Sequence, residues 1–214
     1  MKQRAASTAP CAFIAFWDRE HGVAVGLGQL RTTENGGASW KEHMDPGTGM
    51  RRNLRKVVIT GPRTAVVASL GGGLLRSEDR GMTWQAVEIG ETSNFYALAF
   101  PTQAVGYAAG QGKMWKTMDG GVSWQPLPSG LREIYGMHFF DPMHGIAVGR
   151  GVGPEGCFGG PPKTATLHVT DDGGATWTAN TTPAGDMSSG VHSPTPQRGF
   201  AVGSNSIVML TLAP

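Results

Sequence analysis

The chain has 214 residues, including 33 glycines and 14 prolines, and its formal net charge is +2. This length suits one large all-β domain or two small ones, and the abundance of turn-forming residues favours strands over helices. The near-balanced charge argues against attraction of the whole chain to nucleic acid, and no apolar run is long enough for a membrane-spanning helix.

The first residues, Met1 to Arg4, have the charge of a signal-peptide n-region, but the segment that follows is small and polar. The apolar run at residues 13–17 is short and passes directly into Asp18-Arg19-Glu20. It therefore predicts a strand and not a leader, and the sequence leaves the compartment open.

An eight-residue pattern recurs four times along the chain, at residues 33–40, 77–84, 117–124 and 170–177. Its consensus is Ser/Thr-x-Asp-x-Gly-x-Ser/Thr-Trp. A short strand of apolar and small residues precedes each copy and appears a fifth time, at residues 21–26, 64–69, 105–110, 144–149 and 198–203. A period of about forty residues with several short strands per unit indicates a β-propeller blade.

We therefore predict an all-β fold: a single β-propeller domain over residues 1–214 with about five four-stranded blades. The repeats cover about residues 11–43, 55–88, 94–127, 133–180 and 188–214. In the third unit, strands a to d are expected near residues 96–100, 105–109, 113–117 and 123–127. The fourth unit carries an insertion of about 14 residues near residues 150–163.

The eight-residue pattern has a mechanical explanation in the turn between strands c and d. The central Asp or Asn can accept hydrogen bonds from backbone N–H groups a few residues on, and the Gly after it tolerates positive φ. The Trp is expected to open strand d and to fill the space between blades. We therefore interpret these residues as structural: Asn35, Trp40, Asp79, Trp84, Asp119, Trp124, Asp172 and Trp177.

No cofactor or metal site is expected. A calcium loop of EF-hand type needs a longer run of oxygen ligands and a distal Glu, and the repeated turn offers neither. His21 and His144 hold matching positions in a–b turns, which indicates turn packing and not metal ligation. Cys11 and Cys157 lack CxxC or CxxH spacing, so we expect two unpaired thiols, while a bridge between them stays open.

These patterns resemble the Asp-box, or bacterial neuraminidase repeat, superfamily. An aromatic residue and Asp, followed by His-Gly-x-Ala-x-Gly, at residues 16–26 and 140–149 resemble the photosystem II stability/assembly factor-like propellers. The resemblance covers about residues 11–210 and implies a non-catalytic protein-interaction or assembly-factor role. Members of that family commonly have more blades and an export signal. Here Asn35 replaces the box Asp, and the fifth unit reaches Pro214 before any box.

In a four-stranded meander the a–b and c–d turns share one face, so the b–c and d–a loops lie on the other. The longer, less repetitive loops fall on that second face, where repeat proteins usually keep function. It also holds the densest basic run, at residues 50–56. We predict a docking patch for an acidic peptide or carboxylate, with solvated charge as the alternative. Its residues are Arg51, Arg52, Arg55, Arg132 and Arg150.

The leading hypothesis is a non-catalytic propeller that binds an acidic protein or peptide. We expect no nucleic-acid partner, and we expect a monomer in preference to an oligomer. The alternative is a sialidase-type glycoside hydrolase, since sialidases also carry Asp boxes. That chemistry needs an arginine cluster and a tyrosine with an acidic partner, and the three tyrosines are Tyr96, Tyr107 and Tyr135. A third reading is a fragment of a longer propeller.

The fifth unit contains strands a to c but lacks strand d. Residues 4–8 beside residues 207–212 would complete this last blade with an N-terminal strand and cover an open edge. The alternative is an open five-unit arc that pairs with a second copy.

Overall fold

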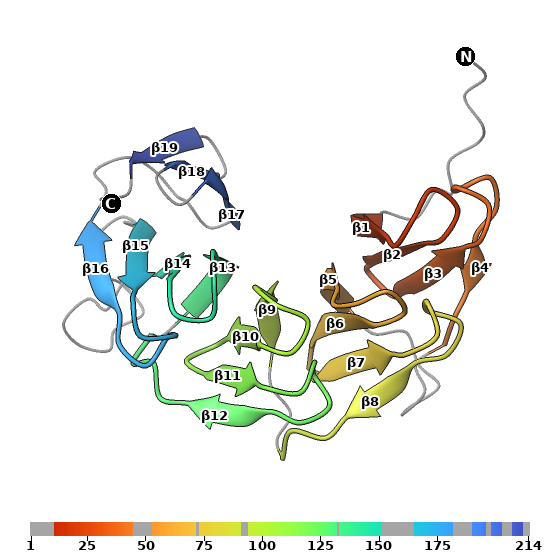
Figure 1. The fold of residues 1–214 in the computed structure, drawn as a ribbon, viewed down its shortest axis with the longest axis horizontal. Helices are drawn as coiled ribbons and strands as arrows, with labels where there is room; N and C mark the ends of the chain where they lie inside the picture. Colours follow the sequence, from red (N-terminus) through yellow and green to blue (C-terminus); the bar gives the residue numbers. More distant parts are fainter. Residues whose placement is uncertain are drawn as a thin grey trace.

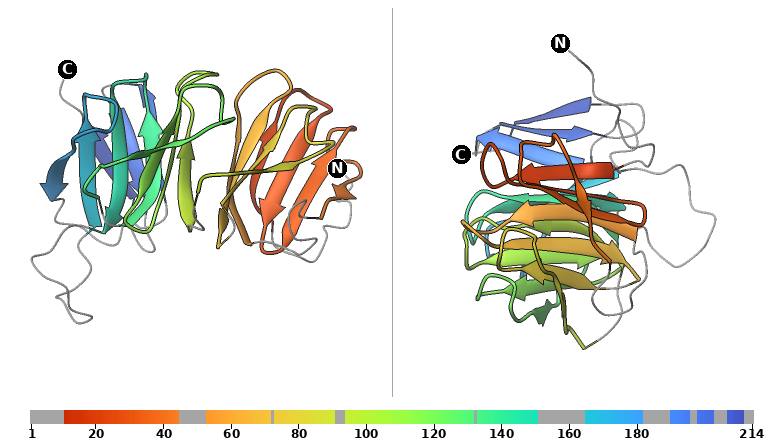
Figure 2. Two further views of the ribbon diagram at one scale, coloured as in Figure 1. Left: turned by 90° about the horizontal axis from the view of Figure 1, so that it is seen from below. Right: turned by 90° about the vertical axis from the view of Figure 1, so that its right-hand side faces the viewer.

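The computed structural model describes residues 11–44, 53–71, 73–90, 94–131, 133–150, 165–181, 190–195, 198–202 and 207–211. These residues form five antiparallel sheets arranged side by side in an arc, with no helix among them (Figures 1 and 2). The predicted all-β propeller fold is confirmed. Each sheet is one blade, and blades 1 to 5 are numbered in chain order.

Strand bounds follow the repeat. Blade 1 contains β1 (Cys11–Phe16), β2 (Gly22–Gly26), β3 (Gln29–Thr33) and β4 (Lys41–Glu42). Blade 2 contains β5 (Asn53–Ile59), β6 (Ala65–Leu70), β7 (Leu74–Ser77) and β8 (Gln85–Val87). Blade 3 contains β9 (Phe95–Ala99), β10 (Gly106–Gly110), β11 (Met114–Thr117) and β12 (Gln125–Leu127). Blade 4 contains β13 (Glu133–Phe139), β14 (Gly145–Arg150), β15 (Ala165–Thr170) and β16 (Thr178–Thr181).

Blade 5 has three described strands, β17 (Gly190–Thr195), β18 (Arg198–Val202) and β19 (Ile207–Thr211), paired in that order. The strand expected from residues 4–8 lies outside the described residues, so the proposed completion of this blade stays a prediction. The insertion at residues 151–163, which includes Cys157, also lies outside the described residues, so its structure and the pairing of Cys157 stay untested.

The first strand of every blade lies on the inside of the arc and the last on the outside (Figure 1). Consecutive inner strands contact one another: β1 with β5, β5 with β9, β9 with β13 and β13 with β17. Alternate residues of one strand pack toward opposite neighbours, as the two-residue period of a strand requires. In β6, Ala65 and Val67 join a core with blade 1, whereas Val66 and Ala68 join a core with blade 3.

The c–d turns are closed by the hydrogen bonds that their composition favours. In blade 3, the Thr117 hydroxyl accepts from the N–H of Gly121 at 2.9 Å, and the Asp119 carboxylate accepts from the N–H of Ser123 at 3.0 Å. The box Trp lies one residue before strand d and does not open it. In blade 3, Trp124 Nε1 donates to the Gly121 carbonyl at 3.2 Å.

Each c–d turn is also bonded to the a–b turn of its own blade. The N–H after the box Asp or Asn donates to an a–b carbonyl at 2.8 Å in all four complete blades, as in the bond from Gly120 to Ala104. The two kinds of turn therefore share one face of the arc, which we call the box face. The b–c and d–a connections lie on the opposite loop face, where the b–c turn of one blade bridges to the next blade through Leu27 with Asn53 and Gln111 with Glu133.

Candidate functional site

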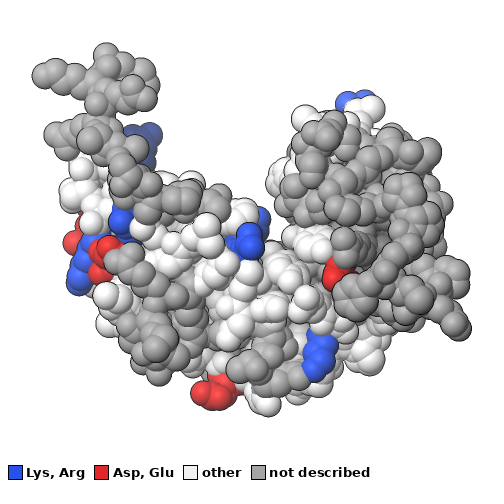
Figure 3. All heavy atoms as spheres, turned by 180° about the vertical axis from the view of Figure 1, so that it is seen from behind, with Lys and Arg blue, Asp and Glu red and all other residues white. Residues whose placement is uncertain are grey.

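The predicted basic patch is only partly within the described structure. Arg55 lies in β5 and is exposed, and Arg150 is the last residue of β14, although its side chain is not described. Arg51, Arg52 and Arg132 fall outside the described residues. Seen from behind, the described basic and acidic side chains form small separate groups around the arc (Figure 3). The five arginines therefore remain a prediction as a set, with Arg55 as its described member.

Arg55 belongs to a structural repeat that the sequence did not reveal. The pairing between the first two strands of a blade shifts by one residue at Arg55, at Tyr96 and at Tyr135. In blade 1 the same shift occurs at Ala12. Each is a β-bulge near the loop-face end of an inner strand, and bulges re-aim side chains next to functional sites. We call Arg55, Tyr96 and Tyr135 the rim row.

The two tyrosines of the rim row contact each other across a blade boundary, and polar contacts lie beside them. The rings of Tyr96 and Tyr135 lie with their centroids 5.4 Å apart, and Tyr135 Oη donates to Glu133 at 2.7 Å. Just before Tyr96, the Asn94 side chain accepts from the N–H of Gly71 in blade 2 at 2.6 Å and donates to Gln111 at 3.0 Å. Both tyrosine side chains are half-buried.

Farther along the inner strands, equivalent residues of adjacent blades meet in pairs. Lys56 Nζ lies 5.3 Å from the centre of the Phe13 ring, and the rings of His138 and His192 are 5.0 Å apart. Burial lowers the pKa of Lys56. Burial, together with His192 and Lys56, lowers the pKa of His138. The lowered pKa values favour the uncharged forms of Lys56 and His138, so these side chains line the inside of the arc as nitrogen-bearing groups and not as a continuation of the charge of Arg55.

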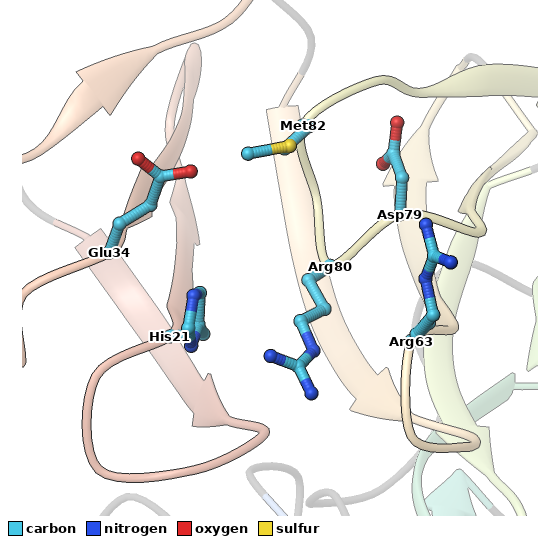
Figure 4. Close-up of a pocket in the computed structure, with 6 residues that line it drawn as sticks. All are labelled: His21, Glu34, Arg63, Asp79, Arg80 and Met82. Carbon is cyan, nitrogen blue, oxygen red and sulfur yellow. The ribbon is translucent and has the colours of Figure 1, made fainter.

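A hollow of about 380 Å³ opens on the box face between blades 1 and 2 (Figure 4). Its charged side chains are of both signs, which favours internal ion pairing. His21 Nδ1 lies 2.9 Å from Asp18, and Arg80 lies 3.4 Å from the same carboxylate. Hydrogen bonds from the N–H groups of His21 and Glu20 hold the pKa of Asp18 well below its usual range. The lining residues are His21, Glu34, Arg63, Asp79, Arg80 and Met82.

Arg80 is the unusual residue of this hollow. Its φ is 61°, whereas the equivalent box position in the other blades is Gly36, Gly120 or Gly173. Its guanidinium Nε donates to the Pro62 carbonyl at 3.2 Å, which holds it over the a–b turn. The sequence marks this position, because the second box is the only one of the four in which Gly does not directly follow the central Asp or Asn. Such strain costs about 1 kcal/mol and is kept where the surroundings fix it.

Within the described residues, no three His, Cys, Asp or Glu side chains gather as a metal site. The described part of the chain also has no helix that could span a bilayer.

No family model and no curated protein sequence matches the chain. Among solved structures, an ancestral GH74 enzyme matches with a TM-score of 0.70 and 15% identity, over 92% of this chain and 29% of its own. The Niastella koreensis GH74 enzyme matches with a TM-score of 0.66 and 17% identity, over 90% and 34%. YCF48 bound to D1 peptide matches with a TM-score of 0.47 and 16% identity, over 94% and 92%.

The GH74 likenesses are similarities of fold, and they agree with the propeller architecture described above. The chain spans about a third of the length of these enzymes.

Proposed function

We propose that the protein is a non-catalytic interaction or assembly propeller that binds an acidic peptide segment on its loop face. The observation that carries the proposal is the rim row: three consecutive blades present Arg55, Tyr96 and Tyr135 at the same bulge of the inner strand. The basic residues predicted beside it, Arg51, Arg52, Arg132 and Arg150, would extend the same surface.

The chemistry of the row suits such a ligand. The planar guanidinium of Arg55 can bind a carboxylate through two parallel hydrogen bonds. Tyrosine rings offer a flat surface and a polar tip at low cost in conformational entropy, which is why they are enriched at binding interfaces. Lys56 and His138 add nitrogen-bearing side chains farther along the inside of the arc.

The test is fluorescence anisotropy with labelled peptides of one length and aromatic content, in which Asp and Glu are retained in one series and replaced by Asn and Gln in another. We expect binding of the acidic series only, weakening as salt is raised. Arg55→Ala combined with Tyr96→Ala should weaken binding by about tenfold or more.

The matched control is Arg63→Ala, which removes an exposed arginine on the box face. Binding that is equal for the acidic and amide series, or that falls equally in the control variant, would remove the rim row from the binding site.

One observation favours the second candidate, a sialidase-type glycoside hydrolase. This chemistry uses a tyrosine nucleophile, and Tyr135 donates its hydroxyl proton to Glu133 at 2.7 Å. A fluorogenic sialoside, followed by a panel of glycosides, tests it. Tyr135→Phe keeps the ring and removes the hydroxyl, so it abolishes turnover if the protein is an enzyme and leaves peptide binding largely intact if it is not.

The chain could also act as part of a longer propeller. The lengths of the GH74 matches are consistent with this third candidate. The mass of the protein isolated from its source, compared with 22.5 kDa for this chain, tests it directly.

A further inference from the structure

Every blade presents two faces to its neighbours: a forward face toward the next blade in the chain and a backward face toward the previous one. The forward residues of the second strand are fully buried in blades 1 to 4, as shown by Val23 in β2, Val66 in β6 and Ile146 in β14. Blades 1 and 5 stand at the two ends of the arc, so among the described residues no blade lies against the backward face of blade 1 or the forward face of blade 5 (Figure 1).

The forward face of blade 5 is apolar and exposed. Phe200 and Val202 occupy the positions of Ile146 and Val148, yet they are 40% and 37% exposed. Their cross-strand partners on the same face, Met209 and Ile207, are 61% and 76% exposed. Four apolar side chains thus form a contiguous surface of the kind that marks an interface.

The backward face of blade 1 is also apolar and exposed, as the forward face of blade 5 is. Ile14 is 59% exposed, whereas the residues at its position in blades 2, 3 and 4, Val57, Leu98 and Met137, are at most 7% exposed. Phe16 is 42% exposed and meets Trp40 edge to face, with centroids 6.3 Å apart.

This Phe–Trp pair is the same element that other blades bury against a forward face. Phe100 and Trp124 meet at 5.9 Å in blade 3, and Phe139 and Trp177 meet at 6.0 Å in blade 4. Gly121 beside Trp124 is so close to Val66 of blade 2 that an added Cβ would lie 2.9 Å from that side chain. Blade 1 therefore carries a preformed surface whose usual partner is the forward face of another blade.

We propose that these two surfaces bind each other between two copies of the chain, so that blade 5 of one copy packs on blade 1 of a second copy, head to tail. Each internal boundary of the arc joins one forward face to one backward face, and the two exposed faces of the described blades are one of each kind. For the two faces to meet within a single copy, the angle between adjacent blades would have to change at the four blade boundaries. Three of these boundaries are filled by Trp84, Trp124 or Trp177. Close-packed interiors resist such changes. A second copy meets both faces without altering any of them.

Three variants and the wild type test the proposal by sedimentation equilibrium over about two decades of protein concentration. The forward variant is Phe200→Glu with Met209→Glu, and the backward variant is Ile14→Glu. The control is Met118→Glu, which charges a 67% exposed apolar residue in the box turn of blade 3. Near-ultraviolet circular dichroism and thermal melts establish that each variant is folded.

We expect the mass of the wild type and of the control to rise from 22.5 kDa toward at least twice that value as concentration increases. The forward and backward variants should each stay monomeric, because every interface needs one intact face of each kind. Mixed one to one, they should form a dimer, since the intact forward face of one meets the intact backward face of the other.

Three results would overturn the proposal. A wild type that is monomeric at every concentration excludes it, and association that then appears on deletion of residues 1–9 would point instead to closure of the arc within one chain. If only the forward variant is monomeric, two forward faces pair with each other. If the mixture stays monomeric, the two faces are not partners.

Discussion

The ring of Tyr107 in blade 3 lies parallel to the ring of Phe139 in blade 4, with centroids 3.7 Å apart and planes within 6°. The Tyr107 hydroxyl donates to the Pro142 carbonyl of blade 4 at 2.6 Å, so one side chain joins two blades by stacking and by a hydrogen bond. Burial, and then the charge of Asp141, raises the pKa of this phenol to about 12.

We expect Tyr107→Phe to lower the free energy of unfolding by about 1–2 kcal/mol, because the partly buried Pro142 carbonyl loses its donor while the stacking remains. Tyr107→Ala should cost about 3–5 kcal/mol, since it also leaves a cavity between blades. Urea denaturation measures both. Equal losses in the two variants would mean that the hydrogen bond, and not the stacked ring, joins the blades.

The same phenol predicts a pH dependence at the alkaline end. Its pKa is higher in the folded protein than its ordinary value of 10.0, so its contribution to stability is complete below about pH 10 and is lost as the pH rises toward about 12. The difference in melting temperature between wild type and Tyr107→Phe should therefore shrink across this window. A difference that stays constant would contradict the raised pKa.

The box tryptophans should differ in importance according to their place in the arc. Trp84 and Trp124 are buried between blades, so replacing either with Ala should lower the free energy of unfolding by about 3–5 kcal/mol. Trp40 at the end of the arc is half-buried, and Trp40→Ala should cost clearly less in the monomer. A loss below about 1 kcal/mol for Trp84→Ala would show that these rings do not hold the blades together.

The box carboxylates predict a loss of stability in acid. Partial burial of Asp119 acts in the opposite direction, but hydrogen bonds from the Ser123 hydroxyl and N–H lower its pKa to about 2. The Thr176 hydroxyl and N–H likewise lower the pKa of Asp172 to about 2. These lowered values contribute stability that is present above about pH 4 and is lost as the pH falls toward 2.

Thermal melts between about pH 4 and pH 2 test this, with Asp119→Asn and Asp172→Asn expected to flatten the decline. Asn35 shows that a box can be built with an amide, because its Oδ1 accepts from the N–H of Ser39 at 2.8 Å. Variants as acid-sensitive as the wild type would mean that other groups carry the acid transition.

The two consecutive box glycines should tolerate substitution differently. Gly120 has a φ of 73°, and an added Cβ would lie 3.0 Å from the Gln103 carbonyl oxygen, but Arg80 occupies the same position in blade 2, so Gly120→Ala should cost about 1 kcal/mol. Gly121 has a φ of 86°, and an added Cβ would also lie 2.9 Å from Val66 of blade 2. Gly121→Ala should therefore cost more, about 2–4 kcal/mol. The reverse order in denaturation experiments would contradict the packing of the c–d turn on the preceding blade.

The repeats made the blades predictable, because the box and the strand before it recur at a nearly constant spacing. In blade 3 the expected strands near residues 96–100, 105–109, 113–117 and 123–127 fall within two residues of β9 to β12. Strand d begins after Trp124, at Gln125, because the ladder with β11 covers only Gln125 to Leu127, and the residue pattern does not show where this pairing starts.

The rim row could not be predicted in this way. A bulge is set by how two strands pair, and Tyr96 and Tyr135 look like ordinary strand residues until their register is known. The sequence predicts Arg55 for a different reason, its place in a basic run, and the structure shows the equivalent bulge position occupied by Tyr96 and Tyr135 in the next two blades. The strain at Arg80 was visible as a missing Gly, but its contact with Pro62 depends on how the turns meet.

The central claim, that the loop face binds an acidic peptide at the rim row, is tested most directly by photo-crosslinking. An acidic peptide with a photoreactive group at its centre is irradiated with the protein, and the adducts are mapped by mass spectrometry. The account predicts adducts at residues 53–56, 94–97 and 133–136, suppressed by an excess of unlabelled acidic peptide but not of its amide counterpart. Adducts confined to the box face, around residues 79–83, would contradict it.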